Sequence, residues 1–206
     1  MKKNLFLIFI ILFLFTSFKI PTKEIKISNF KLKSATTNDW VSLADFKNVK
    51  GFIVVFISNK CPMARFYTTR LNQINDKYKS SNVFVLAINS MDTLVYANES
   101  FSKMQKKAKT EKLNFPYLQD KKQNVAKQFK AENTPQAFVI WKNKFSRFTI
   151  KYQGAIDDNA GEPEKVKNHF LTDALDQLLQ EKQVLVAKSQ SFGCRIFYRG
   201  VKDKMK

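Results

Sequence analysis

Cysteine and histidine are scarce in this sequence. Its 206 residues include two cysteines, Cys61 and Cys194, and one histidine, His169. A structural zinc ion needs four such ligands, so the composition disfavours a zinc site. A cysteine–histidine hydrolase would depend on His169, which falls in an expected amphipathic helix far from Cys61 in sequence. We therefore expect no metal ligands and no tightly bound cofactor.

Acidic residues are also few, with 17 Asp and Glu against 36 Lys and Arg, for a net charge of +19. Such an excess can indicate binding to nucleic acid or to an anionic membrane surface. Here the cations are scattered along the chain, without an arginine-rich block or a nucleic-acid-binding signature. We therefore expect a solvated basic surface and no nucleic-acid partner.

Only one long apolar run is present, and it marks the N-terminus. Lys2-Lys3 precedes the eleven apolar residues 5–15, and Thr16-Ser17 ends the run. This is the form of a secretory signal, shorter than the ~20 residues of a membrane helix. No small-residue cleavage site follows, so residues 4–18 are either a cleaved signal or an uncleaved anchor. Both alternatives place the remainder outside the cytoplasm, in the periplasm or cell envelope.

Three shorter apolar runs predict buried strands at 52–57, 83–88 and 137–141. A helical pattern over 62–78 joins the first two, which predicts a parallel βαβ unit with a right-handed crossover. A turn of hairpin length at 142–144 predicts an antiparallel strand over 145–152. Weaker patterns predict strands near 24–33, 40–43 and 115–118 and helices over 100–113, 123–129 and 166–179.

This order of elements is that of an α/β, thioredoxin-like fold with a mixed central sheet flanked by helices. We divide the chain into a signal or anchor at 1–22, a thioredoxin-like domain at 23–183 and a C-terminal extension at 184–206, which carries Cys194.

Cys61-Pro62 directly follows the first buried strand. Proline suits the first turn of a helix, so Cys61 is expected at a helix N-terminus. The helix dipole and free N–H groups there lower the pKa of a thiol. The neighbouring cations Lys60 and Arg65 would act in the same direction, unless they are simply surface groups.

The two cysteines permit one pairing. It would be either a redox pair or a structural bridge, whose loop of roughly 130 residues could contribute ~4–5 kcal/mol. Two unpaired thiols are the third alternative.

Several short motifs occur in a fixed order along residues 26–197. They are Asn59-Lys60-Cys61-Pro62, Arg70-Leu71-Asn72, Ile88-Asn89-Ser90, Phe115-Pro116-Tyr117-Leu118, Thr134-Pro135, Gly154-Ala155-Ile156-Asp157-Asp158 and Gly193-Cys194. Together they resemble the peroxiredoxin-like redoxins of the AhpC/TSA superfamily, which have a thioredoxin fold. The resemblance implies that Cys61 is the nucleophile and that the Thr134–Pro135 peptide bond is cis. It also implies a substrate groove formed by Thr134, Pro135 and Pro62, in which an incoming peptide or thiol pairs with the backbone of Thr134.

The sequence departs from the related patterns at informative positions. Ala64 replaces the second cysteine of Cys-x-x-Cys, so Cys61 cannot form a disulfide within its own helical turn. Ser58 could supply the hydroxyl of a peroxiredoxin site, but Val54 replaces its proline, which disfavours efficient peroxidase activity. Gly193-Cys194-Arg195-Ile196 is similar to a terminal Gly-Cys-x-Ile in the family, which implies that Cys194 resolves the intermediate formed on Cys61.

We therefore expect an exported thiol-disulfide oxidoreductase with Cys61 and Cys194 as catalytic residues. Its partners would be a thiol, disulfide or hydroperoxide substrate and a reducing protein, with membrane contact only through the N-terminal segment. Two alternatives stay open. One is a peroxiredoxin-like antioxidant peroxidase, and the other is a non-catalytic binding domain of the cell envelope.

Overall fold

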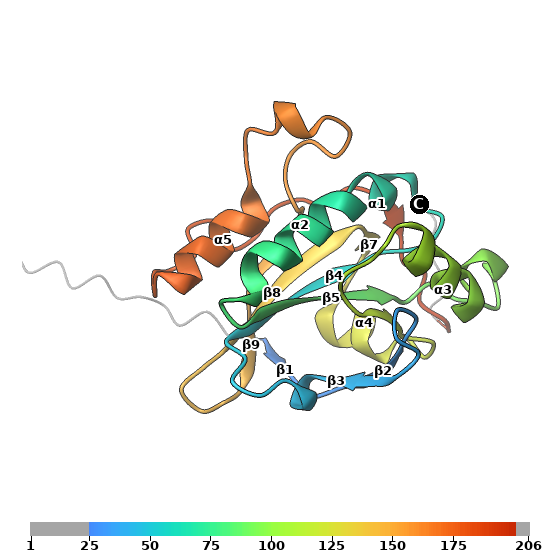
Figure 1. The fold of residues 1–206 in the computed structure, drawn as a ribbon, viewed down its shortest axis with the longest axis horizontal. Coiled ribbons are helices and arrows are strands. Elements are labelled where there is room, and N and C mark those ends of the chain that lie inside the picture. The colour runs from blue at the N-terminus through green and yellow to red at the C-terminus, as the bar shows by residue number, and fades with distance from the viewer. Residues whose placement is uncertain (1–24, 201–206) are drawn as a thin grey trace, which may run out of the picture.

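The computed structural model describes residues 25–200, which form a mixed sheet with helices on both faces (Figure 1). The strand order is β1-β9-β8-β4-β5-β6-β2-β3. The strands are β1 (Lys26–Ile27), β2 (Lys31–Ser34), β3 (Trp40–Ser42), β4 (Gly51–Phe56), β5 (Val83–Asn89), β6 (Tyr117–Gln119), β8 (Gln136–Lys142) and β9 (Phe148–Gly154). A separate two-stranded ladder joins β7 (Asn133–Thr134) to β10 (Cys194–Arg195).

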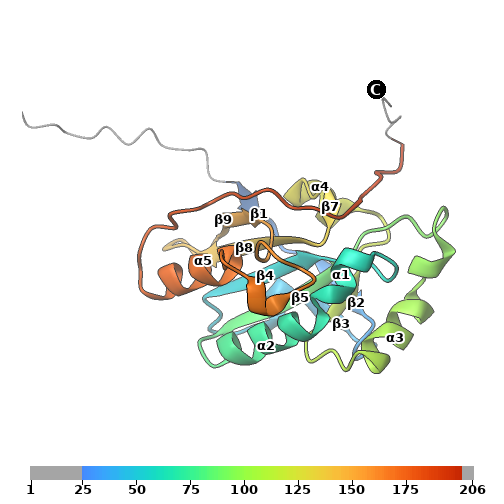
Figure 2. The same cartoon turned by 90° about the horizontal axis from the view of Figure 1, so that it is seen from above.

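The helices are α1 (Pro62–Phe66), α2 (Thr68–Lys79), α3 (Phe101–Thr110), α4 (Asn124–Phe129) and α5 (Phe170–Leu179), with 3₁₀ turns η1 (Leu43–Asp45), η2 (Ala97–Glu99) and η3 (Pro163–Lys165). In Figures 1 and 2, α2 and α5 cover one face of the sheet, and α4 lies on the other. Two apolar clusters accordingly fill the two sides of the sheet.

Strand β4 is central because all six of its residues are apolar or glycine and all are buried. It pairs in parallel with β5 and antiparallel with β8, and β8 pairs antiparallel with β9. The predicted βαβ unit, the hairpin and the mixed sheet are therefore confirmed. Alternate β4 residues enter the two clusters: Ile53 packs on the side of α2 and α5, and Phe52 on the side of α4.

Three helix predictions were wrong in extent, and one of them is the helix expected over 100–113, which ends at Thr110. The segment 62–78 is two helices, because Tyr67 ends α1 and its hydroxyl is held by Asp157 at 2.9 Å. The helix expected from 166 begins only at Phe170. The carboxylate of Asp158 accepts the N–H groups of Lys167 and Asn168, both at 3.0 Å, which keeps the preceding residues in a loop.

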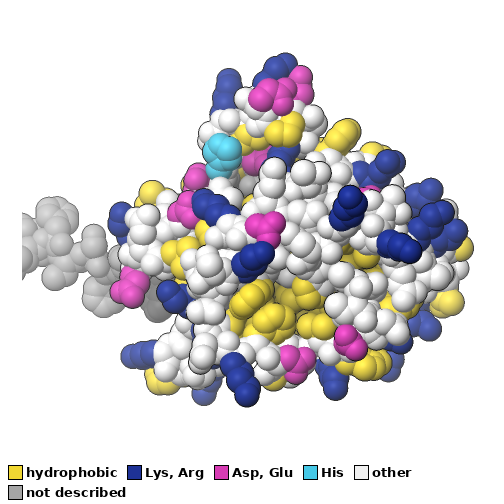
Figure 3. Space-filling model, in the orientation of Figure 1, with side chains coloured by type: hydrophobic (Ala, Val, Ile, Leu, Met, Phe, Trp, Pro, Cys, Tyr) yellow, Lys and Arg dark blue, Asp and Glu magenta, His cyan; other side chains and the backbone are white. Residues whose placement is uncertain are grey.

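After α5 the chain runs back along the molecule to β7, as Figure 2 shows for the red segment. Within residues 25–200, no helix has the length and apolarity needed to cross a bilayer. The expected signal or anchor at 1–22 lies outside the described residues. Figure 3 shows Lys and Arg side chains distributed over the face of the molecule that is seen in Figure 1, as the scattered cations of the sequence predict.

Gly51 at the start of β4 provides a test of the central packing. A Cβ atom added there would lie 2.6 Å from the carbonyl oxygen of Ile140 and 2.4 Å from a ring carbon of Trp141. We expect Gly51→Ala to lower the free energy of unfolding by about 1–3 kcal/mol, because the β8 backbone must shift.

Gly161→Ala is the matched control, since nothing lies within 4 Å of a Cβ added at that loop position. Its stability should be unchanged or slightly higher, because alanine restricts the unfolded chain. Urea denaturation measures both variants, and equal stability of the two would contradict the packing argument.

Candidate active site

Cys61 lies between the end of β4 and the start of α1. It is the N-cap of α1 with Pro62 in the first turn, which confirms the expected helix start. The residue is only 2% exposed. Its Sγ donates a hydrogen bond to the carbonyl oxygen of Thr134 at 2.8 Å. The strand–turn–helix of β4 and α1 thus delivers the thiol to the segment just before β8.

The Thr134–Pro135 peptide bond is cis, which confirms the expectation drawn from the resemblance. Thr134 is fully buried, and its Oγ1 lies 3.2 Å from the hydroxyl of Ser58. The backbone of Thr134 therefore lies against the thiol of Cys61 on one side. Its other side is paired with β10.

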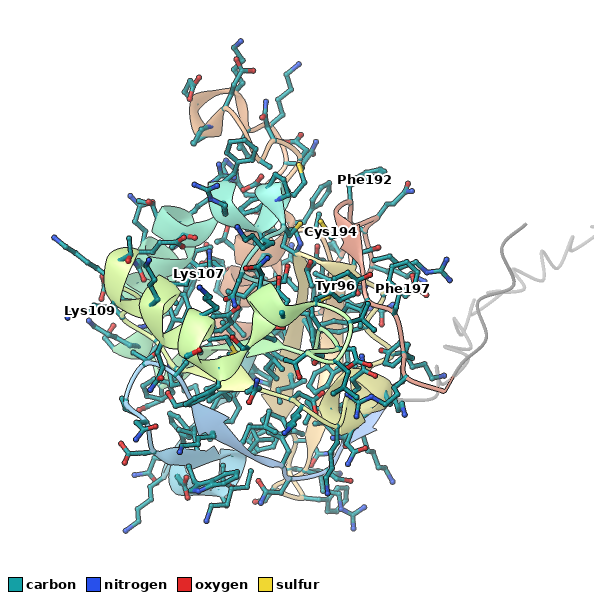
Figure 4. The ribbon with its side chains drawn as sticks, turned by 90° about the vertical axis from the view of Figure 1, so that its right-hand side faces the viewer. Tyr96, Lys107, Lys109, Phe192, Cys194 and Phe197 are labelled. Atoms are coloured by element: carbon teal, nitrogen blue, oxygen red, sulfur yellow. The ribbon has the colours of Figure 1, made fainter. Side chains whose placement is uncertain are left out.

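Cys194 lies directly opposite Thr134 in the antiparallel ladder of β7 and β10. In Figure 4 it lies between Phe192 and Phe197 on the C-terminal segment. Gly193 permits this approach, because a Cβ there would lie 2.1 Å from the carbonyl oxygen of Thr134, and its φ of +154° favours glycine. Both cysteines are free thiols in this state. The structure thus brings together the first and the last of the sequence motifs, which contain Cys61 and Cys194.

The two thiols affect each other's pKa in opposite directions. Burial acts to raise the pKa of Cys61. Hydrogen bonds from the Cys194 thiol, the backbone N–H groups of Ala64 and Cys194, and the Thr134 hydroxyl outweigh it, so the pKa is lowered. For Cys194, burial and then its hydrogen bond to Cys61 raise the pKa to about 12. The pair therefore loses its first proton from Cys61, and Cys194 keeps the other.

The cause of the lowered pKa bears on one expectation. For Lys60 and Arg65 the sequence left two alternatives, stabilisation of the thiolate or a plain surface position; both side chains are exposed, and the groups that lower the pKa of Cys61 are hydrogen-bond donors. One of them, the backbone N–H of Ala64, belongs to the start of α1, as the helix-terminus argument requires.

A buried carboxylate that the sequence reasoning missed supports the loop before Cys61. Glu99 is 3% exposed and accepts the backbone N–H groups of Asn59 at 2.7 Å and Lys60 at 3.1 Å. Its Oε2 also accepts from Asn89 at 2.8 Å. No pattern in the sequence links η2 to this loop. The contact joins residues about forty positions apart, and only the folded structure brings them together.

The segment after Cys194 is anchored by contacts that the sequence did not predict. Ile196 is buried, and its N–H donates to Glu132 at 2.7 Å. Gln123 bonds the backbone of both Phe197 and Arg199, at 2.8 and 2.7 Å. The Arg199 side chain pairs with Asp92, whose pKa is lowered chiefly by this hydrogen bond. We call residues 191–199 the tail strand.

Nothing in residues 25–200 forms a cluster of three or more His, Cys, Asp or Glu that could hold a metal ion.

Replacing Glu99 tests its support of the active-site loop. In Glu99→Gln the side-chain NH₂ must face a backbone N–H, whichever way the amide is turned. We expect the free energy of unfolding to fall by about 1–3 kcal/mol, because a buried donor is left without an acceptor. Alkylation of Cys61 should also slow. The exposed Glu162→Gln, which removes only a surface ion pair with Lys165, is the matched control and should change neither.

The hydrogen bond between the thiols predicts a difference between two variants of Cys194. Serine keeps a donor for the Cys61 thiolate, and alanine removes it. The pKa of Cys61, measured as the midpoint of its alkylation rate against pH, should therefore be higher in Cys194→Ala than in Cys194→Ser. Identical midpoints would show that the Cys194 side chain does not stabilise the thiolate.

Comparisons with known proteins show the family and the fold of this chain. The AhpC/TSA family model matches residues 24–152. A protein of Sinorhizobium meliloti 1021 described as hypothetical is 30% identical, with a TM-score of 0.77 over 87% of this chain and 96% of its own. An uncharacterized conserved protein from Geobacillus kaustophilus is 29% identical, with a TM-score of 0.76 over 86% and 92%.

A Chlorobium tepidum protein described as a thiol:disulfide interchange protein, DsbE, shares the fold at 19% identity, with a TM-score of 0.55 over 78% of this chain and 96% of that one. The curated proteins gave no match. The family match covers more than half of the chain, and the fold and the cis-proline are those that the motifs implied. The chain therefore belongs to the AhpC/TSA family of thioredoxin-fold redoxins, which are generally thiol-dependent oxidoreductases.

Proposed function

We propose that this protein is a thiol-disulfide oxidoreductase in which Cys61 is the nucleophile and Cys194 the resolving thiol. The observation that carries the proposal is the pair of free thiols at the β7–β10 ladder, with the pKa of Cys61 lowered and that of Cys194 raised to about 12. The thiolate is the attacking form in disulfide exchange, so Cys61 reacts first.

In the first step, the Cys61 thiolate attacks one sulfur of a substrate disulfide R–S–S–R′. The Cys61–S–S–R bond forms, the S–S bond of the substrate breaks, and R′S⁻ leaves. This step removes the negative charge from Cys61, and the charge and hydrogen bonding of Cys61 are among the causes of the high pKa of Cys194. Cys194 therefore becomes easier to deprotonate once the mixed disulfide exists.

In the second step, Cys194 attacks the sulfur of Cys61, and its proton passes to the RS⁻ group that departs from Cys61. The Cys61–Cys194 disulfide forms, and R leaves as RSH. Thr134 and Gly193 hold the two sulfurs close, so no large rearrangement has to precede this step. A reducing partner with two thiols then restores both cysteines and is itself oxidised to a disulfide.

A hydroperoxide is the second oxidant to test, because the family includes peroxidases and the Ser58 hydroxyl lies beside that of Thr134. Attack on ROOH would give a Cys61 sulfenic acid and ROH, and Cys194 would release water on forming the disulfide. We further propose that the protein acts outside the cytoplasm, on the strength of the apolar residues 5–15 behind Lys2-Lys3.

The experiment is mass spectrometry of the alkylated, non-reduced protein before and after mild treatment with a disulfide or with hydrogen peroxide. We expect a Cys61–Cys194 disulfide to appear and to reverse with a dithiol. In Cys194→Ser, substrate should remain bound as a mixed disulfide, and Cys61→Ser should form no adduct.

Three outcomes would contradict the proposal. A bridge that stays closed under mild reduction would indicate a structural staple, and the absence of any reaction would indicate a binding domain. Reaction with peroxide far faster than with any disulfide would instead assign the protein as a peroxidase.

A further inference from the structure

The backbone edge beside the reactive thiol is already occupied by the protein's own chain. Cys194 and Arg195 pair with Thr134 and Asn133, the residues that would otherwise take an extended polypeptide as an added strand. The Asn133 side chain also donates to the backbone and the hydroxyl of Ser191, both at 3.3 Å.

The tail strand and the residues just before it are held on both sides of Cys194. On the C-terminal side are the buried Ile196, the Arg199–Asp92 ion pair and the Tyr198 hydroxyl, which donates to Ala131 at 2.5 Å. On the N-terminal side, the Ser189 hydroxyl lies 2.6 Å from that of Tyr152 and accepts the N–H of Ala155 at 3.0 Å. A polypeptide can pair with Thr134 only after these contacts break.

A pocket of ≈ 290 Å³ lies next to residues that flank the reactive thiol, although Cys61 itself is not part of its wall. Its walls include Met63, two residues after Cys61, and Pro135, next to the Thr134 carbonyl that binds the thiol. Phe170 and Phe192 add apolar surface. Two carboxylates also line the wall: Asp157 is paired with Arg70 and bonded to Tyr67, and Asp158 accepts the backbone N–H groups of Lys167 and Asn168. The pocket has room for a small molecule.

We propose that the substrate of Cys61 is a low-molecular-mass disulfide, which enters by this pocket, and not an extended polypeptide. The inference rests on the proposed function and specifies its substrate class. The tail strand excludes polypeptides from the edge of β7 and at the same time supplies the resolving thiol. Only the fraction of molecules with the tail released can accept a peptide, so the apparent reactivity toward peptides falls by that fraction.

The test uses Cys194→Ser, in which Cys61 is the single thiol and serine preserves the strand. Two probes carry the same leaving group: the mixed disulfide of cysteamine with thionitrobenzoate, and a linear peptide whose one cysteine carries thionitrobenzoate. Attack on the cysteamine or peptide sulfur forms a mixed disulfide with Cys61 and releases thionitrobenzoate, whose absorbance gives the rate. We expect the small probe to react about tenfold faster or more, since closed molecules exclude the peptide.

Loosening the tail should bring the rate with the peptide closer to the rate with the small probe. With Arg199→Ala, and more strongly with Ile196→Ala/Arg199→Ala, we expect the rate with the peptide to rise several-fold and the rate with cysteamine to stay within a factor of about two. The control is Lys188→Ala, which removes a charge from an exposed position in the same segment and should change neither rate. Ala160→Trp, which fills the pocket, should slow the small probe several-fold.

The outcomes separate the inference from the function on which it rests. Equal rates with both probes, or no effect of Arg199→Ala on the peptide, would overturn the substrate class. An unchanged rate with the small probe in Ala160→Trp would overturn the entry route. Failure of Cys61 to react with either probe would instead contradict the proposed oxidoreductase activity.

Discussion

The backbone of Thr134 is the constraint on which the site depends. Its carbonyl accepts from Cys61, its peptide bond to Pro135 is cis, and its strand pairs with that of Cys194. One residue therefore contacts the thiol of Cys61 and pairs with the backbone of Cys194 at once. The strand–helix unit that carries Cys61 would not by itself bring the two thiols together, and neither would the segment that carries Cys194.

The same arrangement divides the chemistry between two otherwise equal groups. Isolated cysteine thiols have a pKa near 8.5, so two of them would compete as nucleophiles. Here burial opposes the charging of both, and only Cys61 receives enough hydrogen-bond donors to offset it. One of those donors is the thiol of Cys194, which must keep its proton in order to donate. In the proposed mechanism, the order of reaction therefore follows from which sulfur lies at the start of α1.

The apolar pattern of the sequence was sufficient to predict the central part of the fold. The apolar runs of β4, β5 and β8 gave the parallel unit and the antiparallel hairpin, because strands buried on both faces have few other arrangements. The position of Cys61 before Pro62 gave the helix start. The cis bond at Pro135 could be expected only through the resemblance, since most X-Pro bonds are trans.

The remaining features of the site depend on contacts between distant parts of the chain. Glu99 gives no local signal, because its role arises only when η2 lies under the loop of Asn59. The tail beyond Cys194 has no helical or alternating period, and it is ordered by individual bonds to Gln123 and Asp92. The predicted helix ends were wrong for a related reason. Tertiary hydrogen bonds of Tyr67 and Asp158 override the local helix propensity at these positions.

These tail contacts favour the proposed redox pair over a structural staple. A staple stabilises mainly by restricting the unfolded chain, and it matters most where a segment has few other attachments. Here the segment is attached on both sides of Cys194 while the thiols are free, through buried Ile196 on one side and Ser189 on the other. Folding of the tail therefore does not wait for the disulfide. A bridge whose loss leaves its surroundings in place can open and close repeatedly, which is the property that catalysis requires.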